Sequence, residues 1–279
     1  MKNIIKSISI SLAFILTTSS LYSQELNYGP KIAFGVGKIK SKKLMEYFDF
    51  KKSNNSNIKE YNLSSSNGLT YSIGGFVSYS MNEKINFIGE LSFQKLSTSI
   101  TIDFVEDNAQ TGLSYRETVD SRNKVSVSSF NLPLMVKYNV QENIFILGGF
   151  SFDFILSNKM TSEETLVDES FNGPGILTES NTSKSYNEID MDNFGSPRTN
   201  FILGAGTNLS VSESNISIDI RYNHPLTNSV MYSSSTSIDN NSEKSDVFGV
   251  LEYRDIIQDG FVIDDFKMGT FMLTISYYL

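Results

Sequence analysis

The 279-residue sequence contains no cysteine and only one histidine, His224. Without cysteine the chain can form no disulfide bond, carries no lipid-anchored cysteine at its N-terminus, and offers neither a thiolate nucleophile nor a cysteine ligand for a metal. A single histidine rules out a histidine-based metal site, and a Ser-His-Asp triad would depend on His224 alone. We therefore expect no enzyme activity, no cofactor and no metal site, and keep a hydrolase built on His224 only as an alternative.

A basic stripe and a long apolar run are also missing. The formal net charge is −8, and removal of residues Met1 to Ser23, which hold two lysines and no acid, brings it to −10. Such an acidic chain is a poor candidate for binding nucleic acid, which requires basic surface. Beyond the N-terminal segment, no apolar run reaches the ~20 residues that a transmembrane helix needs.

The N-terminal segment has the pattern of a signal peptide. Lys2 and Lys6 flank a short basic region, and Ile8 to Leu16 form an apolar stretch that is too short to span a membrane. We predict cleavage near Ser23 or Gln24. The expected organisation is thus a signal peptide over residues 1–23, followed by one β-domain over residues 24–279.

The remainder of the chain contains eight segments rich in Val, Ile, Phe, Tyr, Ser and Thr, which are typical of strands. The segments are Asn27 to Ile39, Gly68 to Ser80, Ile85 to Phe104, Lys124 to Asn139, Asn143 to Ser157, Arg198 to Val211, Asn215 to Val230 and Asp265 to Leu279. Short connections follow the second, fourth and sixth segments. Long connections follow the others: Lys40 to Asn67, Val105 to Asn123, Asn158 to Pro197 and Met231 to Asp264. This rhythm predicts an all-β fold: an eight-stranded antiparallel up-and-down transmembrane β-barrel of the cell outer membrane, with long extracellular loops and short periplasmic turns.

Alternating side chains indicate which face of each strand points inward. In the last segment, Phe271, Leu273 and Ile275 share one face, while Thr270 and Thr274 share the other. In a membrane barrel the apolar face meets lipid and the polar face lies inside. The same phase on every strand places three acids and three bases inside the barrel: Lys31, Glu90, Lys137, Asp153, Asp219 and Arg221. Because so narrow a barrel holds little water and unpaired charges there are costly, we predict a neutralised interior charge network rather than a conducting pore.

Small residues follow the same inward phase, namely Gly35, Gly37, Gly74, Gly149, Gly204 and Gly206. They could leave room for larger interior side chains, or they could mark bends and bulges of curved strands. Pro133 lies within the fourth segment, where it lacks a ladder donor, so we expect a local bulge or kink there.

The long connections differ in charge. The third and fourth are acidic, with Glu163, Glu164, Asp168, Glu169, Glu179, Glu188, Asp190 and Asp192 in the third and Asp239, Glu243, Asp246, Glu252, Asp255, Asp259 and Asp264 in the fourth. The first connection is basic, with Lys40, Lys42, Lys43, Lys51, Lys52 and Lys59. These charges either capture a cationic partner or divalent ions near the lipopolysaccharide surface, or form a solvated rim, which is the commoner role of charge runs.

Two of these connections also carry signs of local structure. Leu44, Met45, Tyr47 and Phe48 have helical spacing and predict a short amphipathic helix, which lies at the membrane interface or packs among the loops. In the fourth connection, Asp259-Gly260 is suited to a tight hairpin turn.

Several stretches resemble a known family: SFNLPLMVKYN (Ser129 to Asn139), DNFGSPRTNFILGAGTNL (Asp192 to Leu209), RYNHPLTN (Arg221 to Asn228), GPKIAFGVG (Gly29 to Gly37) and the terminal FMLTISYYL. They are similar to the PorT-like outer-membrane β-barrel proteins of Bacteroidota. The resemblance implies an eight-stranded barrel in the outer membrane, and the member that names the family is an accessory of a gliding-associated protein secretion system.

The expected function is that of a non-enzymatic integral outer-membrane β-barrel protein, with a role in envelope structure, surface interaction or protein-secretion support. The alternative is a small-ligand-binding or transport barrel with a lumenal site. Expected partners are outer-membrane lipid and lipopolysaccharide, the barrel-assembly machinery through the C-terminal strand, and secretion or surface proteins.

Overall fold

The computed structural model describes residues 25–54, 56–110, 113–172, 175–190, 197–211, 214–228 and 266–279. Its elements are β1 (Leu26–Lys40), α2 (Lys42–Asn54), β2 (Ile58–Ser66), β3 (Gly68–Ser80), β4 (Ile85–Gln110), β5 (Leu113–Asn139), β6 (Ile144–Asn172), β7 (Ile176–Asp190), β8 (Arg198–Val211), β9 (Ser214–Pro225) and β10 (Lys267–Tyr278). The signal-peptide prediction and the Asp259-Gly260 hairpin fall outside the described residues.

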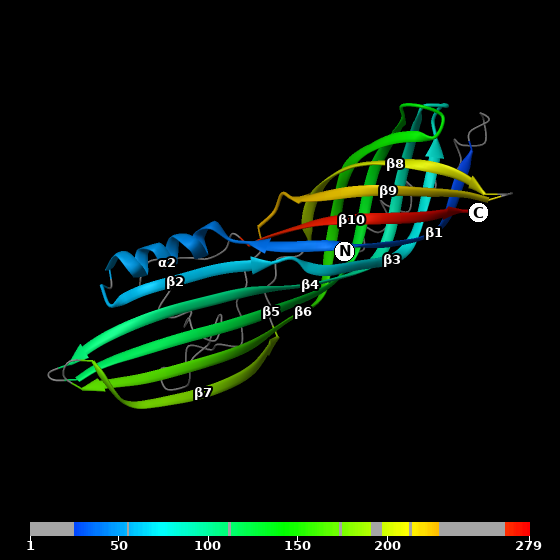
Figure 1. Cartoon of the computed structure of the whole chain (residues 1–279). Coiled ribbons are helices and arrows are strands. Elements are labelled where there is room, and N and C mark those ends of the chain that lie inside the picture. Colours follow the sequence, from blue (N-terminus) through cyan, green and yellow to red (C-terminus); the bar gives the residue numbers. More distant parts are fainter. Residues whose placement is uncertain are drawn as a thin grey trace, which may run out of the picture.

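Eight of these strands form a closed antiparallel ring (Figure 1). Around the ring the order is β4-β3-β1-β10-β9-β8-β6-β5, and β5 returns to pair with β4. The first and last strands of the chain are neighbours, with Phe34 opposite Leu273. Met81 to Lys84 and the residues around Gln141 form tight turns at one end of the ring. The prediction of an eight-stranded antiparallel barrel is confirmed.

The barrel wall is apolar outside and polar inside. Large hydrophobic side chains such as Phe34, Ile73 and Leu134 are exposed on the outer surface, whereas Gln94 and Thr274 are buried within. A continuous apolar exterior of this extent suits hydrocarbon and would promote aggregation in water. None of the described helices is both long and apolar enough to cross a membrane.

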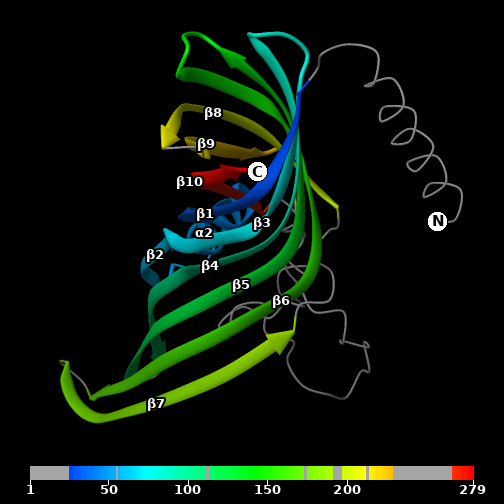
Figure 2. The ribbon, with the colours of Figure 1, turned by 90° about the vertical axis from the view of Figure 1, so that its right-hand side faces the viewer.

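Three strands continue far beyond the barrel. β4, β5 and β6 contain 26, 27 and 29 residues, respectively, whereas a membrane crossing needs only ~9–11 tilted residues. Their outer parts (residues 99–110, 113–124 and 159–172) pair with β2 on one side and β7 on the other. We call this five-stranded unit the projecting sheet. Figures 1 and 2 show it extending away from the ring of shorter strands.

The projecting sheet corrects the interpretation of three long connections as loops. Val105 to Asn123 continues β4 and β5, Asn158 to Pro197 forms most of the β6–β7 hairpin, and Lys40 to Asn67 contains α2 and β2. Far from the barrel, both faces of this sheet carry charged and hydroxyl side chains, so the alternation of apolar and polar residues stops. The backbone pairing continues beyond that point, and the sequence pattern therefore does not reveal it. The fourth long connection lies outside the described residues.

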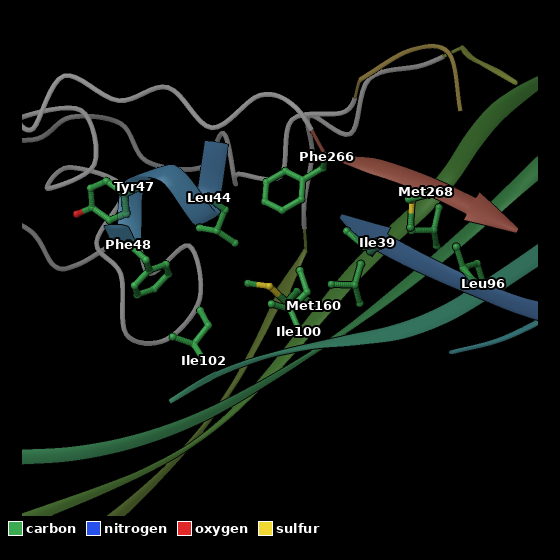
Figure 3. Close-up of a cluster of buried hydrophobic side chains, with 12 residues drawn as sticks. Ile39, Leu44, Tyr47, Phe48, Leu96, Ile100, Ile102, Met160, Phe266 and Met268 are labelled. Carbon is green, nitrogen blue, oxygen red and sulfur yellow. The ribbon is translucent and has the colours of Figure 1, made fainter. Parts of the chain in front are cut away.

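The helix α2 packs over the inward side chains at the outer end of the barrel (Figure 3). The Ser41 hydroxyl accepts a hydrogen bond from the Leu44 backbone N–H at 3.0 Å and caps the first turn. Leu44, Tyr47 and Phe48 are buried, whereas Met45 is 55% exposed. The three buried side chains belong to an apolar cluster, hereafter the apolar plug: Ile39, Leu44, Tyr47, Phe48, Leu96, Ile100, Ile102, Val125, Val127, Met160, Phe266 and Met268. The predicted amphipathic helix is confirmed, and its apolar face packs against the barrel rather than lipid.

The expected bulge at Pro133 is wrong. Pro133 pairs with Ser151 of β6 in unbroken register, and the change of register in β5 falls instead between Ser128 and Ser129. On the β4 side the ladder lacks two consecutive rungs, Glu90 with Pro133 and Leu91 with Leu132, although the register is the same before and after them. The missing proline N–H therefore interrupts the pairing without displacing the strand.

Candidate functional site

All six residues of the predicted interior charge network lie inside the barrel. Lys31, Glu90, Lys137, Asp153, Asp219 and Arg221 are each between 2% and 5% exposed. They come from five of the eight wall strands, β1, β4, β5, β6 and β9, and each has the inward phase of its own strand. The structure divides them into two ionic clusters and one separate lysine.

The first cluster joins β1, β4 and β9. Glu90 accepts hydrogen bonds from Lys31 Nζ and from Arg221 Nη1, the latter at 2.9 Å and 2.8 Å to its two carboxylate oxygens. Arg221 also binds Asp219, through Nε and, at 2.9 Å, through Nη2. Two acids and two bases thus neutralise one another, and the planar guanidinium bridges two carboxylates across the lumen.

The second cluster surrounds Asp153 on β6. Its carboxylate accepts hydrogen bonds from Asn131 of β5, from Asn200 Nδ2 at 3.0 Å and from Arg198 Nη2 at 3.1 Å, the last two from β8. Arg198 was missed by the sequence analysis. The sequence did contain a signal for it, because Arg198 is an even number of residues from the inward Gly204 and so lies on the same face of the strand. In the structure Arg198 is directly opposite Asp153.

Lys137 belongs to neither cluster. Its ammonium group donates hydrogen bonds to Asn208 Oδ1 at 2.8 Å and to the Tyr278 hydroxyl at 3.3 Å. It also lies 3.9 Å from the centre of the Phe145 ring, a cation–π contact. Polar and aromatic neighbours therefore take the place of a carboxylate beside this cation.

Interior glycines give the first cluster its space. A β-carbon on Gly206 would lie 2.5 Å from the Asp219 β-carbon, and one on Gly204 would lie 3.2 Å from Arg221 Cγ. Each of these β-carbons would also meet a backbone carbonyl oxygen of the adjacent strand, that of Ile218 at 2.4 Å for Gly206 and that of Ile220 at 2.7 Å for Gly204, as Gly74 meets Leu91 at 2.1 Å. The inward glycines thus permit close approach of adjacent strands, and Gly204 and Gly206 also leave room for the first cluster.

Little free volume adjoins the first cluster. The cavity lined by Glu90, Lys137, Asp219, Arg221 and Tyr278, among others, measures about 10 Å³. That is close to the smallest volume that accommodates a single water molecule, roughly 10–15 Å³. Above it lies the apolar plug, so the interior beside the first cluster is filled by its own side chains.

The described residues assemble no catalytic or metal centre around the only histidine. His224 is exposed on the outside of β9, where its Nδ1 lies 3.4 Å from the Tyr222 hydroxyl. Within the described ranges, no group of three or more His, Asp or Glu side chains is positioned to hold a metal ion.

Seven of the eight acids of the predicted third loop are held on strands of the projecting sheet, and Asp192 lies outside the described residues. On one face, Glu106, Glu117 and Asp168 form a row of directly opposed acids across β4, β5 and β6. The pKa of Glu117 is raised above its ordinary value of 4.5, chiefly by partial burial and further by the negative charges of Asp168 and Glu106. On the other face Arg116 binds Asp107 through two hydrogen bonds of 2.8 Å and 3.3 Å, and these lower the pKa of Asp107.

Comparison with known proteins identifies one matching family and several structures of the same general kind. The family model described as outer membrane protein beta-barrel domain matches residues 22–230. The attachment invasion locus protein Ail of Yersinia pestis has 13% identity and a TM-score of 0.32, covering 91% of this chain and 99% of its own. The outer membrane protease OmpT of Escherichia coli has 11% identity and a TM-score of 0.28, covering 90% and 96%. TM-scores this low carry no argument about ligands or activity. No curated protein sequence matches the chain.

Proposed function

Because the chain belongs to the outer membrane protein beta-barrel domain family, we propose that it is a non-enzymatic surface-interaction protein that the barrel anchors in the outer membrane. Family membership places the chain in that membrane. The proposal concerns what the anchored protein does there, and it rests chiefly on the projecting sheet.

The projecting sheet supports a role outside the membrane. A barrel that served only as a wall would need no strands of 26 to 29 residues. The extra length places β2, β7 and the outer parts of β4, β5 and β6 beyond the rim that carries α2. Positioned on a rigid barrel, such a sheet presents a fixed surface to molecules outside the cell.

The charge of the sheet indicates the class of partner. Directly opposed acids such as Glu106, Glu117 and Asp168 repel one another and destabilise a sheet. A cationic partner would relieve this repulsion on binding, whereas an anionic partner would add to it. We therefore propose a cationic polypeptide surface as the binding partner.

A shortened variant tests this role. Residues 105–118 and 166–183 would each be replaced by Asn-Gly, which joins opposed positions of the two hairpins by tight turns and leaves the barrel strands intact. Binding of a polylysine probe to the protein in lipid nanodiscs should fall by at least about tenfold, that is by ~1.4 kcal/mol or more.

A second variant separates charge from shape. Glu106→Gln, Glu117→Gln and Asp168→Asn keep the sheet and remove its acidic row. The matched control neutralises three exposed acids elsewhere, Glu46, Glu83 and Glu142. Loss of binding in the first but not the second is expected. Equal binding by the shortened, neutralised and control proteins would refute the proposal.

The filled interior supports an anchoring role over transport. With about 10 Å³ of free volume beside the first cluster and the apolar plug above it, we expect no steady conductance in single-channel recordings. A stable open level would instead favour the transport alternative.

We further propose that the chain belongs to the PorT-like proteins of Bacteroidota. The stretches similar to PorT-like proteins of Bacteroidota lie in wall strands of the barrel, among them β1, β5 and β10. If the chain belongs to that group, its surface interaction supports protein secretion. A deletion strain should then show reduced export and gliding, and unchanged export would contradict this extension while leaving the surface role in place.

A further inference from the structure

A basic groove crosses the outside of the barrel at the end from which the projecting sheet extends. It spans β1, β10 and β9, has a volume of about 640 Å³, and is lined by Lys38, Lys40, Lys42 and Lys267 together with Tyr222 and His224. Among the described residues that line it there is no Asp or Glu. The groove is separate from the interior charge network, because its lysines on β1 and β10, together with Phe271 and Tyr222, lie on the outward face of their strands.

The wall beneath the groove changes from apolar to cationic within one outward rung. Val36, Phe271 and Tyr222 form one row of exposed apolar and aromatic side chains across the three strands. The next outward pair along β1 and β10 is Lys38 opposite Gly269. Aromatic side chains followed by lysines mark the boundary between hydrocarbon and lipid headgroups.

The following outward pair places two like charges directly opposite each other. Lys40 lies across from Lys267 in the register of β1 and β10. Such pairs destabilise a sheet, and no described acid forms an ion pair with either of them. Lys42, by contrast, pairs with Glu46 at 2.9 Å. An anion seated between Lys40 and Lys267 would convert their repulsion into two attractive contacts.

Gly269 gives an anion access to this position. It carries no side chain, so the wall is recessed beside Lys38, and a β-carbon there would already lie 3.5 Å from the Tyr222 hydroxyl. That hydroxyl and the exposed ring of His224 add hydrogen-bonding groups at the edge of the recess.

We propose that this groove binds the phosphate group of a phosphorylated outer-leaflet lipid. Lys38, Lys40 and Lys267 contact the phosphate oxygens, and the acyl chains lie along Val36 and Phe271. A phosphate supplies several strong acceptor oxygens for the converging ammonium groups, and the apolar row below supplies a surface that a soluble anion would not need. The lipid occupies the groove independently of what the projecting sheet binds.

The test uses the full-length protein in nanodiscs of zwitterionic lipid, to which a phosphorylated lipid such as lipid A is added in steps. Wild-type protein should gain thermal stability and bind the lipid at saturable stoichiometry. In the variant Lys40→Gln with Lys267→Gln, affinity for the lipid should fall by roughly 10- to 30-fold. Each lysine near a lipid surface contributes about 1 kcal/mol, which corresponds to roughly fivefold in affinity. Lys40→Arg with Lys267→Arg should retain binding.

The matched control removes two exposed lysines elsewhere, Lys84 and Lys184, and should bind as wild type does. Without phosphorylated lipid, the Lys40→Gln and Lys267→Gln variant should be at least as stable as wild type, because the repulsion is gone, and this excludes misfolding as the cause of lost binding. Unchanged affinity in that variant would overturn the proposal. So would equal stabilisation by inorganic phosphate alone, since the lipid would then not be the ligand.

Discussion

Glu90 holds the first interior cluster together, and its replacement by glutamine gives the sharpest test of the charge network. Glu90→Gln keeps the size of the side chain but leaves the buried Lys31 and Arg221 with only the Asp219 carboxylate between them. Removing one partner of a buried ion pair typically costs ~3–5 kcal/mol, because a buried charge loses its compensation. Arg221 retains Asp219, so the loss falls mainly on Lys31, and we expect about 3–4 kcal/mol.

The loss is measurable by urea unfolding of the protein from lipid vesicles. For an urea slope of ~2–3 kcal/mol/M, a loss of this size lowers the midpoint by about 1–2 M. A Glu90→Gln midpoint indistinguishable from that of wild type would refute the reasoning, since Glu90 would then not compensate the two cations.

A second substitution identifies the cause of the loss. Lys31→Met added to Glu90→Gln removes the uncompensated cation and leaves Arg221 paired with Asp219. Replacing buried ions with apolar groups of similar size is often neutral, so the double variant should recover at least half of the lost stability. The double-mutant cycle then gives the coupling between Lys31 and Glu90 directly. A double variant less stable than Glu90→Gln would show that Lys31 stabilises the barrel by other contacts.

Three further predictions concern other parts of the molecule. Gly206→Val should prevent folding into the heat-modifiable form seen on gels, because its β-carbon would lie 2.5 Å from that of Asp219, whereas Gly89→Ala meets nothing closer than 3.8 Å and should fold. Ser41→Ala should cost about 1 kcal/mol of helix stability through loss of the cap, and proteolysis within α2 should accelerate. The raised pKa of Glu117 means that its contribution to folding is greatest below its unfolded pKa and is lost as pH rises through the folded one. Hydrogen exchange in the projecting sheet should therefore be slower, after correction for intrinsic rates, at pH 5 than at pH 8, and Glu117→Gln should remove the difference.

The barrel was predictable because one physical rule acts on every wall strand. A side chain on the wall faces either hydrocarbon or a narrow polar interior, so the period-two pattern is strong in segments such as Lys267–Tyr278. The same rule identifies interior residues by parity, and the structure finds Lys31 and Asp153 buried. Arg198 escaped because it lies at the first residue of its strand, where the pattern has only just begun.

The projecting sheet was not predictable by the same rule, because beyond Ile102, Val119 and Met160 both of its faces are largely polar. Its strands are held by backbone pairing and by ion pairs such as Asp107 with Arg116. Along the sequence, residues of these polar types are typical of loops. The register shift between Ser128 and Ser129 likewise could not be predicted, because no proline or glycine lies there. Information of this kind lies in pairing between strands that are separated in sequence.

The barrel interior and the projecting sheet are built on the same three strands. β4, β5 and β6 pass without interruption from the ionic clusters, through the apolar plug, into the sheet: β4 carries Glu90, Leu96 and Ile102 in succession on its inward face. Because these side chains are fixed by buried ion pairs below and by packing against α2 above, the strands leave the barrel in a defined direction. A conducting lumen would require removing the contacts that set this direction. The filled interior and the fixed external surface are therefore two consequences of the same packing.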